Sequence, residues 1–210
     1  MKTLGIFGGT FDPIHLAHLR LALELKQHLG LDEMRLLPCH QPPHRAAPGV
    51  DSEQRAAMAQ LAVANCPALT VDTRELRRDS ASYTVDTLRE LRRELGDQVS
   101  LCLAMGMDSL VNLHTWERWQ ELPSLAHLVV AARPGWSPPE QGPVAALLDH
   151  YQADKTALAR QACGTIVVET LRLLPISASD IRAQLSAGES PQFLLPESVW
   201  AYICEHGLYQ

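Results

Sequence analysis

The chain alternates short apolar runs with longer stretches in which apolar residues recur at helical spacing. Runs of strand length occupy residues 4–7, 34–38, 69–72, 99–105, 127–132 and 165–169. Helical spacing predicts helices over 16–29, 51–65, 84–95 and 144–160, with two more at 179–187 and 197–206. Gly30 is expected to end the first helix, and Asp51, with Gln54 three residues later, to begin the second.

Strands separated by helices of this length are typical of right-handed β-α-β crossovers, which build a mostly parallel sheet. The sequence therefore predicts an α/β fold: a single, doubly wound Rossmann-like domain over residues 1–210, with a helical C-terminal part from about residue 176. An excursion loop explains the Pro- and Gly-rich segment 133–143 as well as a domain boundary does. Ligands of such folds bind beyond the C-terminal ends of the strands. The site is thus expected in the loops after Phe7, Pro38, Asp72, Met105 and Ala132.

Charge and composition narrow the range of partners. The 24 acidic and 18 basic residues leave a net charge of −6, which argues against DNA or RNA because nucleic-acid-binding surfaces are basic. The five cysteines include no CxxC pair, so neither a disulfide framework nor a zinc ribbon is expected. No apolar run approaches the ~18 residues of a membrane helix. We expect a soluble, cytoplasmic protein without a membrane partner; the oligomeric state, a homo-oligomer included, stays open.

The segment GGTFDPIHLAH, residues 8–18, follows the first expected strand and leads into the first helix. Gly8 and Gly9 let backbone N–H groups approach a phosphate, because no Cβ stands in the way. The helix start adds unpaired N–H groups and the positive end of its dipole. Neither GxGxxG nor the P-loop pattern GxxxxGK[ST] is present. The segment is expected to bind the phosphates of ATP in an enzyme.

His15 and His18 stand three residues apart, so they share a face if they lie on the first turn of that helix. Two imidazolium groups there would neutralise charge on a phosphoryl group during its displacement. Two other roles stay open. A histidine near a helix start is often a cap or a surface residue, and HxxH also suits two metal ligands, with Asp12 as the only nearby third one.

The segment ISASDIR, residues 176–182, is expected to open another helix. Ser179 is placed to cap it, and Arg182 offers a planar fork of N–H donors to phosphate oxygens. A capped helix with a solvated arginine explains this segment equally well when it is taken by itself.

Both segments resemble motifs of the nucleotidyltransferase superfamily that adenylylates mononucleotides. Residues 8–18 are similar to its GGTFDPxHxxH signature, and residues 176–182 to its ISxTxIR run, with Ser179 in place of Thr. Further segments resemble the bacterial nicotinate-mononucleotide adenylyltransferases in the same order: PPHR at 42–45, SYTxxTL at 82–88, GMDSL and TW within 106–116, RPG at 133–135 and the stretch 194–209. The resemblance covers nearly the whole chain.

The resemblance implies that the phosphate of nicotinate mononucleotide attacks the α-phosphorus of ATP, giving nicotinate adenine dinucleotide and pyrophosphate for NAD biosynthesis. Mg²⁺ would be held mainly by the ATP phosphates and water, with no protein ligand. The catalytic residues would be His15, His18 and Arg182. The ATP-binding residues would be Gly8, Gly9, Thr10, Phe11, His18, Arg45, Gly106, Asp108, Ser179 and Arg182, and those binding nicotinate mononucleotide Thr84, Trp116, Glu117 and Arg133.

The residue chemistry suits a nicotinate ring. Trp116 offers a π-face to a pyridinium, a contact of about 1–2 kcal/mol when desolvated, although a lone tryptophan after a strand is more often a core residue. Thr84 is expected to begin a helix, where its hydroxyl and the nearby backbone N–H groups suit a carboxylate. Asp108 is expected to bind a ribose hydroxyl, to cap a helix, or both. Glu117 is expected to face water while its backbone N–H makes the contact, because its carboxylate would repel that of nicotinate.

Two residues depart from the family pattern. Ala17 replaces the Gly of HxGH, and Cys39 stands where an Asn often follows the second strand. Ala17 matters only if the backbone there must touch the nucleotide, whereas Cys39 removes an amide contact. Nicotinamide mononucleotide and phosphopantetheine are alternative acceptors, the second disfavoured because it has no ring to stack on Trp116. A catalytically silent nucleotide-binding regulator is the alternative from another class.

Overall fold

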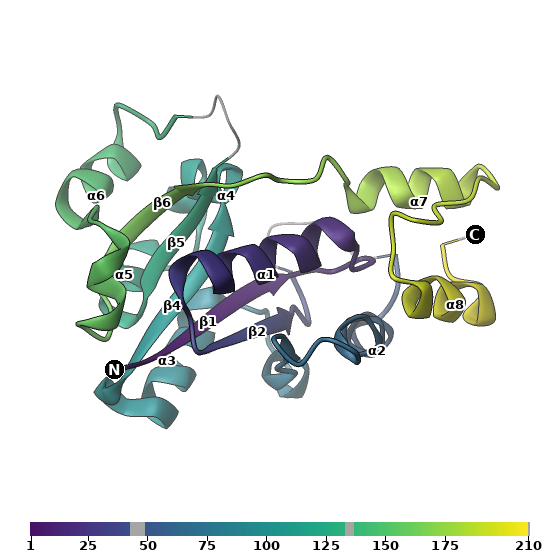
Figure 1. Cartoon of the computed structure of the whole chain (residues 1–210), viewed down its shortest axis with the longest axis horizontal. Coiled ribbons are helices and arrows are strands. Elements are labelled where there is room, and N and C mark those ends of the chain that lie inside the picture. The colour runs from purple at the N-terminus through teal and green to yellow at the C-terminus, as the bar shows by residue number, and fades with distance from the viewer. Residues whose placement is uncertain (43–48, 133–136, 210) are drawn as a thin grey trace. The chain divides into compact units, whose positions relative to one another are not determined.

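The computed structural model describes residues 1–42, 49–132 and 137–209. Its strands are β1 (Lys2–Gly9), β2 (Glu33–Pro38), β3 (Thr70–Val71), β4 (Val99–Gly106), β5 (His127–Ala132) and β6 (Ile166–Thr170). They form one six-stranded sheet in the order β3-β2-β1-β4-β5-β6, in which the pairs β1–β4, β4–β5 and β5–β6 run parallel (Figure 1). This is the strand order of a doubly wound Rossmann-like sheet, whose winding reverses between β1 and β4. The predicted fold class is confirmed.

Most of the helices lie close to those that the helical spacing predicts, but the short helices at 107–111 and 122–125 are not among the predicted ones. The helices are α1 (Leu16–Leu29), α2 (Ser52–Val63), α3 (Thr84–Leu95), α4 (Met107–Val111), α5 (Leu122–Leu125), α6 (Pro143–Tyr151), α7 (Ala178–Ser186) and α8 (Glu197–His206). Gly30 follows α1 with a left-handed φ of 65°, and Asp51 caps α2 by accepting a hydrogen bond from the N–H of Gln54. Both predicted helix ends are confirmed. None of the helices in the described parts of the chain has the length and apolar character needed to cross a bilayer.

Two predicted helices differ from the structure. The helix predicted over 144–160 is wrong beyond Tyr151, because Gln152 forms a bridge with Ile166 and Asp154 begins a separate 3₁₀ turn by accepting from the N–H of Thr156. The predicted cap Ser179 is also wrong. Ser177 caps α7, its hydroxyl accepting from the N–H of Asp180, so the cap lies two residues earlier than expected.

Internal packing divides the chain into two compact units. The first consists of Met1–Gly8, Glu24–Arg35 and Tyr83–Arg172, and the second of Gly9–Leu23, Leu36–Ser82 and Leu173–Gln210. In the first unit all residues of β5 are buried, and α3 buries Val85, Leu88 and Leu91 completely. In the second unit α2 packs against β3 and α8, with Met58 and Val199 fully buried.

The register of the first unit aligns two loops that the sequence places far apart. Phe7 of β1 is paired with Ala104 of β4 in the parallel ladder. The C-terminal ends of these two parallel strands therefore lie at the same edge of the sheet. This is the edge at which doubly wound folds bind ligands.

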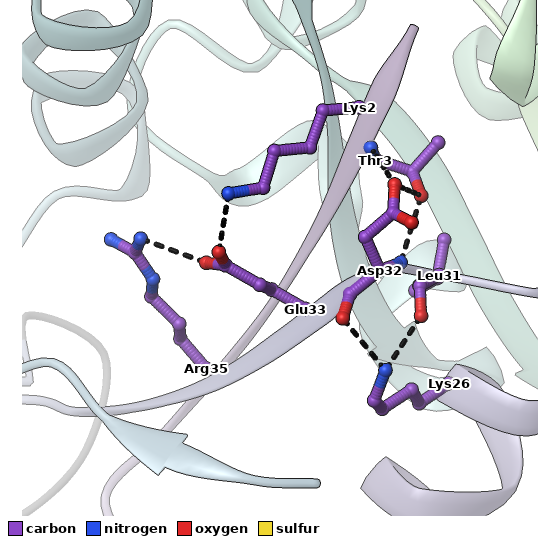
Figure 2. A network of polar contacts seen from close by, with 7 residues as sticks. All are labelled: Lys2, Thr3, Lys26, Leu31, Asp32, Glu33 and Arg35. Carbon is purple, nitrogen blue, oxygen red and sulfur yellow. Dashed lines mark hydrogen bonds and ion pairs between the residues drawn. The ribbon is translucent and has the colours of Figure 1, made fainter.

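A polar network joins the first residues of β1 to those at the start of β2, at the other end of these strands (Figure 2). Lys2 and Arg35 both pair with Glu33. The carboxylate of Asp32 accepts from the backbone N–H and the hydroxyl of Thr3, at 2.8 and 3.0 Å. Lys26 donates to the carbonyls of Leu31 and Asp32 just beyond the end of α1. These contacts fix the α1–β2 turn against the start of β1 and leave the other end of the strands to the site.

Candidate active site

The loop between β1 and α1, in the second unit from Gly9 onward, is organised around Phe11. The Phe11 ring is buried and lies edge-on to His18, with 5.1 Å between the ring centroids. The ring also fills the space beside Gly9, where a Cβ would stand 2.6 Å from a ring carbon. Phe11 itself has a left-handed φ of 50°, which is uncommon for a residue other than glycine. Gly9 is therefore required by a side chain two residues later, and the packing of that side chain holds the loop in shape.

His15 and His18 are stacked, with 3.6 Å between their ring centroids and an angle of 20° between the planes. His15 lies immediately before α1 and is buried, and this burial lowers the pKa of its imidazole to about 4. Its Nδ1 has no hydrogen-bond partner among the described residues. With this pKa, the imidazole of His15 is neutral near pH 7, which differs from the expectation of two imidazolium groups.

His18, on the first turn of α1, is only half-buried. Its Nδ1 lies 3.4 Å from the backbone N–H of His15, as an acceptor. With Nδ1 as the acceptor in this contact, Nε2 is the ring nitrogen left to donate. The stacked pair therefore combines a buried, neutral ring with a more accessible ring whose Nε2 is a donor.

Asp12 joins three distant segments of the second unit. Its carboxylate is buried and accepts from the N–H of Gly49 at 2.9 Å and from the hydroxyl of Tyr209 at 2.8 Å, one oxygen for each donor. Arg182 of α7 donates from Nη1 to the backbone carbonyl of Asp12 at 2.6 Å, and the same nitrogen lies 3.6 Å from the carboxylate. Arg182 is thus brought against the loop of the two histidines although it lies 170 positions from Asp12 in the chain.

Arg55 of α2 binds the backbone of the loop between β1 and α1. Its side chain is 1% exposed. Nη1 donates to the carbonyls of Thr10 and Cys39, both at 2.6 Å, Nη2 donates to His40 at 2.9 Å, and Nε to Val50 at 3.4 Å. Among the described residues, every hydrogen-bond partner of this guanidinium is a backbone carbonyl, so Arg55 brings a buried positive charge to the loop with no carboxylate of these residues bound directly to it.

The remaining expected ATP-binding residues of the second unit differ in their placement. The carbonyl of Thr10 accepts a hydrogen bond from Arg55. Ser179 is exposed on the first turn of α7. Arg45 lies outside the described residues, as does Arg133, which was expected to contact nicotinate mononucleotide.

In the first unit, Asp108 lies over the end of β4. A Cβ on Gly106 would stand 2.5 Å from its Oδ1, so the carboxylate occupies the space that a side chain at Gly106 would need. The N-cap of the short helix α4 is Gly106, and no side chain caps it. The interpretation of Asp108 as a cap is therefore wrong. Its side chain is exposed, which suits the other expected role, contact with a ribose hydroxyl.

The expected nicotinate residues of the first unit are Thr84, the first residue of α3, and the turn that carries Trp116 and Glu117. Both Thr84 and Trp116 are half-buried, and the side chain of Glu117 is 50% exposed, as predicted. Arg118 ties the turn to the first turn of α3 by donating to Asp86 at 2.7 Å. This ion pair links the turn that carries Trp116 to the start of α3, where Thr84 lies.

No group of three or more His, Cys, Asp or Glu side chains in the described parts of the chain is arranged to hold a metal ion. Asp12, the carboxylate nearest to the histidine pair in sequence, already accepts a hydrogen bond on each oxygen.

Comparisons with known proteins agree with this geometry. Residues 6–184 match the family model described as cytidylyltransferase-like. Over 208 residues, the chain is 60% identical to a probable nicotinate-nucleotide adenylyltransferase of Cellvibrio japonicus, covering 99% of each chain. It is 53% identical to one of Aeromonas hydrophila, covering 99% of this chain and 97% of that one.

The chain belongs to the cytidylyltransferase-like family and, within it, to the nicotinate-nucleotide adenylyltransferases. The resemblance seen in the sequence motifs is confirmed. The fold is similar to that of a Plasmodium falciparum nicotinic acid mononucleotide adenylyltransferase solved in complex with NaAD, with a TM-score of 0.74 at 16% identity, covering 100% of this chain and 98% of that one.

Two residues of this adenylyltransferase site were missed by the sequence analysis. Tyr209 was noted only as part of a similar C-terminal stretch, and nothing local connects it with Asp12. Arg55 had a recognisable signal. It lies on the face of α2 that also buries Ala56, Met58 and Ala59, and a charged residue on an apolar helix face is unusual unless it is paired.

Proposed function

We propose that this chain transfers AMP from ATP to nicotinate mononucleotide, releasing pyrophosphate and forming nicotinate adenine dinucleotide in NAD biosynthesis. The observation that carries the proposal is the convergence of His15, His18 and Arg182 on one glycine-containing loop. Such a set of N–H donors and positive charge suits the polyphosphate of ATP. Gly8, Gly9, Thr10 and Phe11 would supply the loop backbone, and Arg45 and Ser179 further donors to phosphate.

The two histidines would act differently. The buried Nδ1 of His15 lacks a partner among the described residues, an arrangement that costs about 1–3 kcal/mol and that a hydrogen bond to the ligand would relieve. His18, more accessible and with Nε2 as its donor, would stabilise the charge that develops on the phosphoryl oxygens. Arg182 would contact the phosphates with Nε and Nη2, which have no partner among the described residues.

In the proposed reaction a phosphate oxygen of nicotinate mononucleotide attacks the α-phosphorus of ATP in line with the leaving group. The new P–O bond forms as the bond between the α-phosphorus and the bridging oxygen breaks, and that oxygen leaves with pyrophosphate. No protein nucleophile takes part, so catalysis consists of positioning and charge neutralisation. Mg²⁺, when bound to the ATP phosphates and water, would supply further charge neutralisation.

Nicotinate mononucleotide would be bound by residues of the first unit. The π-face of Trp116 would stack on the pyridinium, and Thr84 and the backbone N–H of Glu117 would bind the carboxylate, with Arg133 near the nucleotide phosphate. Gly106 and Asp108 would contact ATP, Asp108 through a ribose hydroxyl. The side chain of Glu117 supports this assignment, because it is 50% exposed and its carboxylate lies 3.5 Å from the guanidinium of Arg118, which offsets its negative charge.

We also propose that the whole chain acts as one domain and that it works in the cytoplasm without a DNA, RNA or membrane partner. The five cysteines are unpaired, as a reducing compartment favours, and the net charge of −6 disfavours binding to nucleic acid.

Pyrophosphate release with ATP tests the proposal, using nicotinate mononucleotide and nicotinamide mononucleotide side by side at equal concentration. We expect pyrophosphate release when ATP and a mononucleotide are both present, with a clear preference for nicotinate mononucleotide over nicotinamide mononucleotide. A preference for the amide would contradict the assigned acceptor. Binding of ATP without turnover on either mononucleotide would instead identify a silent regulator.

A further inference from the structure

Tyr209, one residue from the end of the chain, is built into the second unit through both its ring and its hydroxyl. The hydroxyl donates to Asp12 at 2.8 Å. The ring packs against the backbone of Gly49, where a Cβ would stand 3.2 Å from two ring carbons. The backbone carbonyl of Tyr209 accepts a hydrogen bond from the hydroxyl of Ser186, at the end of α7. These contacts hold a terminal residue beside Asp12.

Asp12 poses an electrostatic problem for a phosphate site. It is a buried carboxylate three residues from His15, in the loop proposed to receive ATP, and a free carboxylate there would repel phosphate oxygens. Two neutral donors, the N–H of Gly49 and the hydroxyl of Tyr209, occupy one oxygen each. Arg182 then needs only Nη1 for Asp12, mainly through the backbone carbonyl.

We propose that Tyr209 is a positioning residue of the ATP site, which acts through Asp12 to keep Arg182 available to phosphate. The inference rests on the proposed function of the loop. The hydroxyl of Tyr209 occupies Oδ1 of Asp12, while the N–H of Gly49 occupies Oδ2, the oxygen nearest to Arg182. Without the hydroxyl, the carboxylate would lose one of the two contacts that fix its orientation and would be free to turn toward the guanidinium. The Arg182 nitrogen already lies 3.6 Å from the carboxylate, so a small rotation of either side chain would form a closed ion pair and withdraw the guanidinium from the ligand.

Burial and the charge of Asp12 both raise the pKa of the Tyr209 hydroxyl above its usual range. The hydroxyl therefore remains a donor throughout the pH range in which an enzyme is assayed.

Tyr209→Phe tests the proposal, because it removes the hydroxyl and keeps the ring that packs on Gly49. Tyr202→Phe is the matched control: Tyr202 lies on α8 in the same unit and stacks on His206, away from Asp12. We expect Tyr209→Phe to raise the KM for ATP about tenfold, with the KM for nicotinate mononucleotide within about twofold and the melting temperature close to that of Tyr202→Phe. Equal changes in both KM values together with a large loss of thermal stability would show a merely structural role and overturn the proposal.

A double-mutant cycle with Asp12→Asn tests the route through Asp12. If Tyr209 acts through that carboxylate, adding Tyr209→Phe to Asp12→Asn changes the KM for ATP by less than about twofold. Additive effects would contradict the route. Calorimetric binding of a non-hydrolysable ATP analogue to the wild type and to Tyr209→Phe separates this inference from the proposed function. Weaker binding by the variant supports the role of Tyr209 even if the wild type turns over neither mononucleotide, whereas equal binding overturns it.

Discussion

The rings of His15 and His18 lie 3.6 Å apart and almost parallel, yet their environments differ. His15 is 3% exposed, whereas His18 is half-buried on the outer side of the pair. The HxxH spacing therefore places together two imidazoles that differ in exposure. His15 precedes α1, whereas His18 belongs to the helix.

The burial of His15 predicts a loss of stability in mild acid. Its pKa falls from 6.5 to about 4 on folding, so the unfolded chain takes up the proton first as the pH decreases. The stabilisation is complete above about pH 6.5 and is lost progressively down to about pH 4, by about 3 kcal/mol at most. Urea unfolding between pH 7 and 4 measures this loss.

The matched variant in this experiment is His15→Gln, which has no titrating ring at this position. Burial also lowers the pKa of His127, so some acid destabilisation will remain in the variant. We expect its unfolding free energy to fall less steeply with decreasing pH than that of the wild type. Identical slopes in the two proteins would contradict a neutral, buried His15.

His18→Ala is expected to reduce kcat by about two to three orders of magnitude, because it removes a donor from the charge that develops in the transition state. Pyrophosphate release measures the effect, and a thermal melt should show an intact fold. His28→Ala is the control on the same helix: His28 is at the far end of α1, is 44% exposed and pairs with Glu169. Near-wild-type turnover by His18→Ala would refute the mechanism.

Arg55→Lys is expected to lower the free energy of unfolding by about 2–4 kcal/mol. A single ammonium group cannot reproduce the fork that serves Thr10, Cys39 and His40, and some of these carbonyls would be left without a donor. Chemical denaturation measures the loss. Arg93→Lys, an exposed substitution on α3, should stay within about 0.5 kcal/mol of the wild type; similar effects of the two variants would rule out the anchoring role of Arg55.

Trp116→Ala is expected to raise the KM for nicotinate mononucleotide about ten- to thirtyfold and to leave the KM for ATP nearly unchanged. Trp116→Phe, which retains a π-face, should fall between the wild type and the alanine variant. Steady-state kinetics with each substrate varied in turn measures both constants. An effect on ATP alone would remove Trp116 from the proposed nicotinate site.

Local patterns predicted most of the fold. The alternation of apolar runs with helical spacing located the strands and most of the helices, because both depend on side-chain periodicity within a few residues. The cap formed by Asp51 and the end of α1 at Gly30 were also predictable from neighbouring positions. By residue type, Ser177 and Ser179 are equally good helix caps. Only the position of α7 in the fold distinguishes them.

The sequence by itself determined that the chain folds as an α/β sheet with a phosphate-binding type of loop, because glycines, histidines and a helix start stand in one short segment. Only the tertiary structure decided how that loop is held. The hydrogen bond between Asp12 and Tyr209 joins residues 197 positions apart, and no local pattern encodes such a pairing. The burial of Arg55 and the lowered pKa of His15 likewise depend on the removal of water by distant segments, a property of the folded chain and not of any single motif.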